Sequence, residues 1–362
     1  MEEDYKIIDN VIYTPEIKDQ PDGRGIGWVY YEGMLKYRNR VAQIDGLTGE
    51  TDSFGALLLR CVRAAIGLKA KGVQYGDVVS VCTKNHLNSC VPHISSMFVG
   101  AKIAALDPSL TVRDAAHLFK IVMPKIIFVE EESVALIENV INEVGATTTI
   151  VVFGSTDKHE SFLDFAKPNS EEIKFQPVTA KDMKDVAVIM FSSGTSGFPK
   201  GVCHTHFSIL RNSSNAMLLG SFSAITYASD SPYWNVFLFY LNHSLQNGNA
   251  RLIYPKFDLA NPWSIFRHNI TMAFLNVTEL MTLCNTPKPH SIDTTSIKLI
   301  STAGGPINVQ QIQKGRSCFP NTCTEKEYKT ATKTRKKCCK KSVTKNCNLQ
   351  KETSKRIGQK NV

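Results

Sequence analysis

The chain has 362 residues, of which 43% are hydrophobic, enough to bury one large core or two moderate ones. This excludes a wholly disordered or fibrous protein. The net charge of +9 suggests a nucleic-acid or membrane partner, but residues 322–362 hold 13 Lys and Arg against three acidic residues. The residues before Thr322 are therefore close to neutral, and the charge gives no reason to expect a specific nucleic-acid partner.

The cysteines and the N-terminus indicate an intracellular, cytoplasmic protein. The residues Met1–Asp4 are acidic and are not followed by an apolar run, so secretory export is not expected. No apolar run reaches membrane-spanning length. Scattered cysteines in apolar stretches are typical of reduced core residues; here they are Cys61, Cys82, Cys90, Cys203 and Cys284.

Helical and strand patterns alternate between residues 51 and 154, which is typical of βαβ units and a doubly wound α/β layer. We expect Gly72 to end the first helix, Asn85 to cap the second, Thr111 to cap the third and Gly145 to end the fourth. The predicted helices span about 53–71, 85–100, 111–123 and 134–144, and the predicted strands span 77–82, 103–106, 125–129 and 147–153.

The chain is expected to divide into two α/β sub-domains and a tail. Residues 156–185 are polar and contain Pro168 and Pro177, so they are predicted to cross the surface between sub-domains. The predicted boundaries are 1–185, 186–321 and a basic, disordered tail at 322–362. Within the second sub-domain we expect strands at 251–254, 272–275 and 297–301 and a helix near 262–268.

A strand from Val186 leads into a glycine- and hydroxyl-rich loop with one lysine, which suits a polyphosphate. Gly194 and Gly197 allow backbone N–H groups to converge on an anion, and Lys200 adds a positive charge. The lysine does not have the Walker-loop spacing, so a P-loop NTPase is not favoured. A flexible surface turn is the structural alternative. The hydroxyl donors of the loop are Ser192, Ser193, Thr195 and Ser196.

The segment 192–201 closely resembles the signature loop of the adenylate-forming superfamily, which includes acyl-CoA synthetases, 4-coumarate-CoA ligases, firefly-type luciferases and peptide-synthetase adenylation domains. The resemblance covers most of residues 20–321, with 71–79 and 100–108 as further scaffold segments. It implies that the loop holds the β- and γ-phosphates of Mg-ATP while a carboxylate attacks the α-phosphorus. Lys200 and Thr195 would be catalytic, and the implied cofactors are ATP, Mg²⁺ and CoA.

Two more segments resemble functional parts of this family. Tyr233 and Trp234 lie where the family has an aromatic or histidine motif beside a fatty or aromatic acid, although a core role for Tyr233 is equally plausible. The loop after residue 301 resembles the family's adenine loop, and its alternative is a plain strand-to-helix turn. The expected adenine-loop residues are Ala303, Gly304, Gly305 and Pro306. No metal site is expected at His204 and His206, since they lack a partner ligand.

The sequence departs from the family pattern after Asn321. The family's Tyr-Gly-x-Thr-Glu motif, its ribose-binding Asp and its small C-terminal domain are not found, so the chain is expected to be truncated by a frameshift, retained intron or alternative exon near residue 322. Relatives include peroxisomal proteins, but the chain has no C-terminal Ser-Lys-Leu-type signal.

Three functions therefore remain open. The first is an acid-CoA ligase that forms acyl-AMP from a fatty or aromatic acid. The second is a catalytically dead, nucleotide-binding relative or a non-productive product. The third is an interaction protein acting through basic residues such as Lys336 and Lys340. Which acid is activated, and whether luciferase-like oxygenation follows adenylation, stay undetermined by the sequence.

Overall fold

The computed structural model describes residues 6–8, 11–13, 20–192, 199–216, 225–320 and 322. Residues Gln20–Gly315 form one compact unit, and the chain ends, Met1–Asp19 with Arg316–Val362, form another. In the second of these, strands β1 (Lys6–Ile8) and β2 (Val11–Tyr13) pair antiparallel. Residues 323–362 of the expected basic tail lie outside the described residues.

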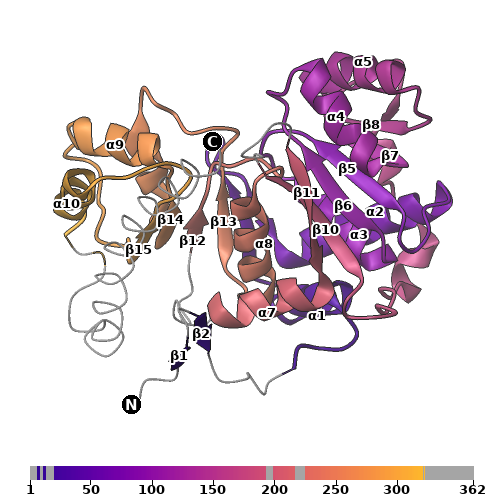
Figure 1. The fold of residues 1–362 in the computed structure, drawn as a ribbon, viewed down its shortest axis with the longest axis horizontal. Helices are drawn as coiled ribbons and strands as arrows, with labels where there is room; N and C mark the ends of the chain where they lie inside the picture. The colour runs from indigo at the N-terminus through magenta and orange to yellow at the C-terminus, as the bar shows by residue number, and fades with distance from the viewer. Residues whose placement is uncertain are drawn as a thin grey trace, which may run out of the picture. The chain divides into compact units, whose positions relative to one another are not determined.

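The larger unit contains a seven-stranded sheet with the order β11-β10-β6-β5-β7-β8-β9 (Figure 1). All neighbouring strands are parallel except β10 and β11, which form an antiparallel pair. The strands are β5 (Val78–Cys82), β6 (Lys102–Leu106), β7 (Ile126–Glu130), β8 (Thr149–Phe153), β9 (Glu160–Ser161), β10 (Val186–Ser192) and β11 (Lys200–Thr205).

A second sheet of six strands has the order β15-β14-β12-β13-β3-β4. Only β3 and β4 are antiparallel. The strands are β3 (Val41–Asp45), β4 (Thr51–Ser53), β12 (Ile225–Tyr227), β13 (Ala250–Ile253), β14 (Met272–Phe274) and β15 (Leu299–Ser301). This layered α/β architecture confirms the predicted fold class.

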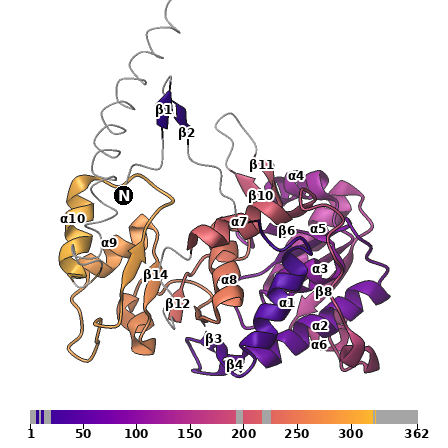
Figure 2. The ribbon, with the colours of Figure 1, turned by 90° about the horizontal axis from the view of Figure 1, so that it is seen from below.

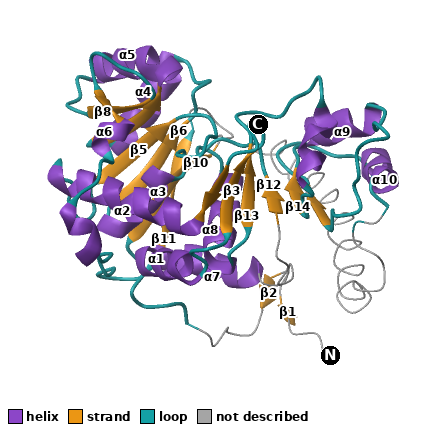
Figure 3. Ribbon diagram, turned by 180° about the vertical axis from the view of Figure 1, so that it is seen from behind, coloured by secondary structure: helices purple, strands orange, loops and turns teal. Residues whose placement is uncertain are grey.

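Helices cover both faces of the seven-stranded sheet (Figures 2 and 3). On one face α2 packs against α3, and on the other α4 packs against α5. The helices are α1 (Ile26–Lys36), α2 (Phe54–Ala70), α3 (Val91–Val99), α4 (Val112–Val122), α5 (Val134–Val144), α6 (Phe162–Phe165), α7 (His206–Ala216), α8 (Asn235–Asn247), α9 (Val277–Asn285) and α10 (Val309–Cys318), with 3-10 turns at Glu131–Ser133, Ser170–Lys174 and Pro262–His268.

Local sequence explains where several helices begin and end. The Ser53 hydroxyl accepts a hydrogen bond from the Ala56 N–H at the start of α2, and Thr111 caps α4. Gly145 ends α5 in the left-handed conformation, with φ of 69°. These helix ends were predicted from the sequence and are confirmed.

Two predictions about this region were wrong. Asn85 does not cap a helix, because α3 begins only at Val91, and its side chain instead donates to the carbonyls of Ser229 and Asp230. The boundary at 185/186 does not separate the sheets either. Strands β10 and β11 belong to the first sheet, while β3 and β4 belong to the second. Periodicity identifies a strand but not its neighbours, so it could not place these four strands.

Candidate active site

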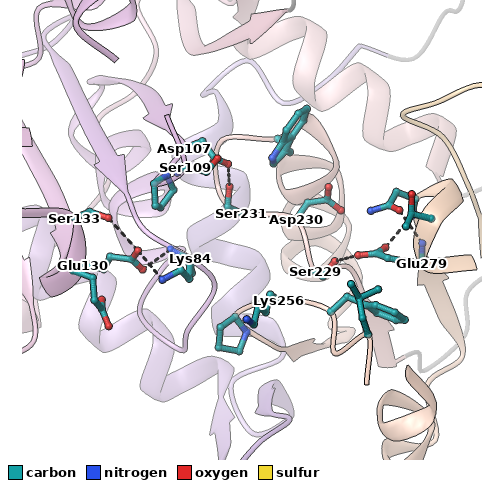
Figure 4. A pocket seen from close by; sticks show the side chains of 18 residues that line it. Lys84, Asp107, Ser109, Glu130, Ser133, Ser229, Asp230, Ser231, Lys256 and Glu279 are labelled. Carbon is teal, nitrogen blue, oxygen red and sulfur yellow. Dashed lines mark hydrogen bonds and ion pairs between the residues drawn. The ribbon is translucent and has the colours of Figure 1, made fainter. Parts of the chain in front are cut away.

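The carboxyl ends of strands from both sheets surround one cavity of about 560 Å³ (Figure 4). In parallel α/β proteins this edge is where ligands bind. Strands β5, β6 and β7 contribute one wall, and β12, β13 and β14 contribute the other. The lining residues are polar in large part: Lys84, Asp107, Ser109, Glu130, Glu132, Ser133, Ser229, Asp230, Ser231, Lys256, Asn276, Thr278 and Glu279, with Pro108, Trp234, Pro255, Phe257 and Leu259.

The predicted phosphate loop leaves the sheet at this same edge. Because β10 runs parallel to β6, its last residue, Ser192, lies at the end of the sheet where β6 leads into Asp107. Ser192 pairs with Lys200, the first residue of β11, and both are exposed. The predicted residues between them, Ser193, Gly194, Thr195, Ser196 and Gly197, lie outside the described residues.

The predicted acid-pocket aromatics lie beside the start of this loop. The Tyr233 ring stacks on Phe191, with 6.2 Å between ring centroids and 19° between ring planes. Trp234 meets Tyr233 edge-on at 5.3 Å and lines the cavity. Tyr233 is 9% exposed and Trp234 is 51% exposed, so only Trp234 offers a large accessible surface to a ligand.

The predicted adenine loop follows β15, at the carboxyl edge of the second sheet. Ala303, Gly304, Gly305 and Pro306 are all exposed, and Gly304 has φ of +87°. A Cβ atom added at Gly304 would meet nothing within 4 Å, so the backbone there is open to a flat ligand. Among the described residues, no hydrogen bond joins this loop to Lys200.

Sequence reasoning missed the carboxylates of the cavity. Ser231 Oγ donates to Asp107 Oδ2 at 2.9 Å, and Ser229 Oγ donates to Glu279 Oε1 at 2.7 Å. Asp230 lies between these two pairs (Figure 4), and its Oδ2 is buried without a hydrogen-bond partner in the structure. The available signal was positional, because each polar residue follows closely on a buried strand.

Burial gives two of these carboxyls unusual proton affinities. Burial, followed by the charges of Glu279 and Asp107, raises the pKa of Asp230 to about 6. Burial also raises the pKa of Glu279, whose Oε2 accepts from the Asn276 N–H at the start of α9. Asp230 is therefore the carboxyl of this wall that changes charge near neutral pH.

The opposite wall holds a fully bonded carboxylate. Glu130 is 8% exposed and accepts hydrogen bonds from the Lys84 N–H at 2.8 Å and from Ser133 Oγ at 3.1 Å. The Lys84 ammonium lies 3.3 Å from Glu130 Oε1, the oxygen that also accepts from Ser133. Lys84 and Lys256 thus bring two ammonium groups to the cavity.

Of the two histidines, His206 lies in the interior of the fold. His206 is 6% exposed, and its Nδ1 accepts a hydrogen bond from the Ile26 N–H at 3.2 Å. Within the described ranges, no cluster of three His, Cys, Asp or Glu residues is arranged to hold a metal ion. No described helix combines the length and apolar character needed to cross a membrane.

Two parallel-rich sheets that share a cavity at their strand ends define an α/β protein built to bind a ligand at that edge. The chain belongs to the AMP-binding enzyme family, which matches residues 32–328. It is similar to 4-coumarate--CoA ligase 3 of Arabidopsis thaliana, with 24% identity over 87% of this chain and 57% of the relative. It is also similar to luciferin 4-monooxygenase of Photuris pensylvanica, with 28% identity over 56% of this chain and 39% of the relative.

Solved structures of similar proteins share the fold. The luciferase-like enzyme from the nonluminescent mealworm Zophobas morio superimposes with a TM-score of 0.80 and 32% identity, covering 85% of this chain and 72% of that one. ATP-bound MatB from Rhodopseudomonas palustris shares the fold at a TM-score of 0.70 and 21% identity, covering 80% and 57%. The chain spans 57% and 39% of the lengths of the two curated relatives.

Proposed function

We propose that this chain supplies the ATP- and acid-binding part of an enzyme that activates a carboxylic acid as its acyl-adenylate. The observation that carries the proposal is the position of the paired strand ends Ser192 and Lys200, which lie at the edge of the sheet where the cavity is found. In the proposed reaction, a carboxylate oxygen attacks the α-phosphorus of ATP, the bond to the bridging oxygen breaks, and pyrophosphate leaves. Transfer of the acyl group to CoA would follow.

The residues divide into three roles in this proposal. The loop hydroxyls and Lys200 bind the phosphates, and Lys200 neutralises charge on the departing pyrophosphate. Trp234 contacts the acid and excludes water from the mixed anhydride. The exposed backbone at Gly304 lies against the adenine. The full phosphate and adenine sets are Ser192, Ser193, Gly194, Thr195, Ser196, Gly197 and Lys200, and Ala303, Gly304, Gly305 and Pro306.

Mg²⁺ would supply further neutralisation of the triphosphate. Hydroxyl and carboxylate oxygens are the donors that Mg²⁺ prefers. Ser192, Asp107 and Asp230 supply such oxygens at the carboxyl ends of their strands. The chemistry of these donors therefore fits a magnesium nucleotide. The fatty or aromatic nature of the acid follows the resemblance, and Trp234 provides the flat apolar surface that either would contact.

The test is titration of the chain with Mg-ATP, followed by ATP–pyrophosphate exchange with a panel of fatty and aromatic acids. Lys200→Ala should weaken ATP binding by on the order of tenfold or more, since it removes a direct charge contact. The matched control is Lys184→Ala, an exposed lysine just before β10, at the other end of the β10–β11 pair from Lys200. Equal ATP affinities for the two variants would contradict the phosphate role of the loop.

A further inference from the structure

The two walls of the cavity come from different sheets, so contacts between the walls must fix their relative position. The segment after β12 carries Ser229, Asp230 and Ser231 and leads into Trp234, all of which line the cavity. The opposite wall begins after β5, at Lys84. Side-chain hydrogen bonds from the wall after β5 and β6 to the segment after β12 therefore determine the shape of the cavity.

Asn85 provides the most buried of these links. Asn85 is the residue after Lys84, and it is 3% exposed. The Nδ2 group donates to the Ser229 carbonyl at 3.2 Å and to the Asp230 carbonyl at 2.8 Å. Two N–H donors on one amide thus hold two consecutive carbonyls of the segment after β12.

The orientation of this amide is fixed by chemistry. A flipped amide would direct Oδ1 at two carbonyl oxygens, which accept hydrogen bonds and cannot donate them. In the observed orientation Oδ1 is buried without a partner. Asn85 also lines a small pocket of about 10 Å³ with Phe237, Tyr240 and Arg251, which is room for about one water.

Ser231 adds a second link two residues further on, through its bond to Asp107. Between them, Asn85 and Asp107 constrain three consecutive residues of the segment. The constraint continues to the Tyr233–Trp234 pair, because the Trp234 N–H donates to the Ser231 carbonyl at 3.0 Å. The position of Trp234 at the cavity thus depends on bonds made by Asn85.

We propose that Asn85 is a positioning residue for the acid-binding wall: by holding the Ser229 and Asp230 carbonyls it fixes Asp230 and Trp234 at the cavity. The role in acid binding rests on the proposed function, whereas the placement of Trp234 does not. Asn85→Asp is the sharpest substitution, because it preserves size but replaces the two N–H donors by a group that repels both carbonyls when charged.

The first measurement needs no ligand. In protein labelled with 5-fluorotryptophan, the ¹⁹F resonance of Trp234 is assigned from Trp234→Phe. Asn85→Asp and Asn85→Ala should move or broaden the Trp234 resonance, while those of Trp28 and Trp263 stay in place. The control is Asn88→Ala, in the same loop, whose buried Oδ1 has no partner and whose side chain makes no hydrogen bond to Ser229 or Asp230.

The second measurement separates positioning from general destabilisation. In ATP–pyrophosphate exchange, Asn85→Asp should raise the KM for the acid by on the order of tenfold to a hundredfold and leave the KM for ATP unchanged. An unmoved Trp234 resonance in both Asn85 variants would overturn the positioning role. If the Asn85 variants shift the Trp234 resonance but the wild-type protein shows no ATP–pyrophosphate exchange, the placement of Trp234 is upheld and the proposed function is rejected.

Discussion

The Ser231 hydroxyl donates a hydrogen bond to Asp107 Oδ2 at 2.9 Å, and this contact joins the segment after β12 to the end of β6. Asp107 also accepts from the Ser109 N–H through its other oxygen, so its carboxylate is held from both sides. The bond connects two sheets whose strands come from different parts of the chain.

Ser231→Ala should lower the free energy of unfolding by about 1 kcal/mol, the usual net value of a partly buried hydrogen bond. Asn85→Ala loosens the same segment. The two changes should therefore be non-additive by at least about 0.5 kcal/mol in a double-mutant cycle followed by urea unfolding. Strict additivity would show that the two links act on independent parts of the wall.

Asp230→Asn should stabilise the protein in a pH-dependent way. The folded-state pKa of Asp230 is raised to about 6 from 3.8. The stability that the protonated Asp230 carboxyl contributes is therefore fully present below pH 3.8, and it is lost as the pH rises through about 6. At pH 7.5 the substitution should therefore increase stability, by at most about 3 kcal/mol, and near pH 4 the gain should be largely gone.

Thermal unfolding at the two pH values measures this difference. The control is Asp157→Asn, which changes an exposed carboxylate and should have the same small effect at both pH values. A gain for Asp230→Asn that does not depend on pH would mean that burial of its charge is not the cause.

Gly304→Ala and Gly305→Ala should separate folding from ligand binding. Gly304 has φ of +87°, so an alanine there should cost about 1 kcal/mol of stability. Gly305 has ordinary backbone geometry, and its added Cβ would lie 3.8 Å from Val277, so the fold should tolerate it. If the loop contacts adenine, Gly305→Ala should weaken ATP binding at unchanged melting temperature, and unchanged affinity would count against that contact.

Gln43→Leu should be strongly destabilising, because it breaks a buried polar network. Gln43 is fully buried; its Nε2 donates to Asp52 at 3.0 Å, and its Oε1 accepts from the buried Arg251 at 2.6 Å. The loss should be about 2–4 kcal/mol in urea unfolding, since charged groups lose a buried partner. The exposed Gln74→Leu serves as the control, and equal losses would show that the network has no stabilising role.

Trp234→Ala should weaken acid binding, whereas Tyr233→Ala should lower stability. Tyr233 is buried and stacked on Phe191, so its truncation should cost about 3 kcal/mol. Trp234 is half exposed at the cavity. Its truncation should leave the melting temperature nearly unchanged while weakening acid binding, measured by calorimetry with a fatty or aromatic acid in the presence of Mg-ATP.

The sequence predicts the local elements of this protein better than their neighbours. The caps at Ser53 and Thr111 and the stop at Gly145 depend on nearby residues, which is why pattern reasoning places those helix ends well. Asn85 was misread because its partners, Ser229 and Asp230, lie 144 and 145 residues further along the chain. A polar residue after a strand looks the same in sequence whether it caps a helix or reaches another sheet.

The site residues of the two glycine-containing loops stay a prediction, which rests on the distinctive composition and order of those loops. Ser192 and Ser301, the residues from which these loops leave, both lie at carboxyl ends of parallel strands. The grouping of Asp107, Asp230 and Glu279 at the cavity was not predictable, since each is a single carboxylate in a separate segment. Only the strand order of both sheets brings the three to one cavity.

Strand β3 pairs with β13 through the register of Gln43 with Arg251, residues 208 positions apart. During synthesis, β3 and β4 leave the ribosome long before β13 has been made. The β3–β4 hairpin therefore keeps an unpaired edge until then. All strands of the seven-stranded sheet lie at or before residue 205. The two sheets therefore mature in sequence, and a nascent chain halted before Ala250 should hold one finished sheet and one aggregation-prone strand pair.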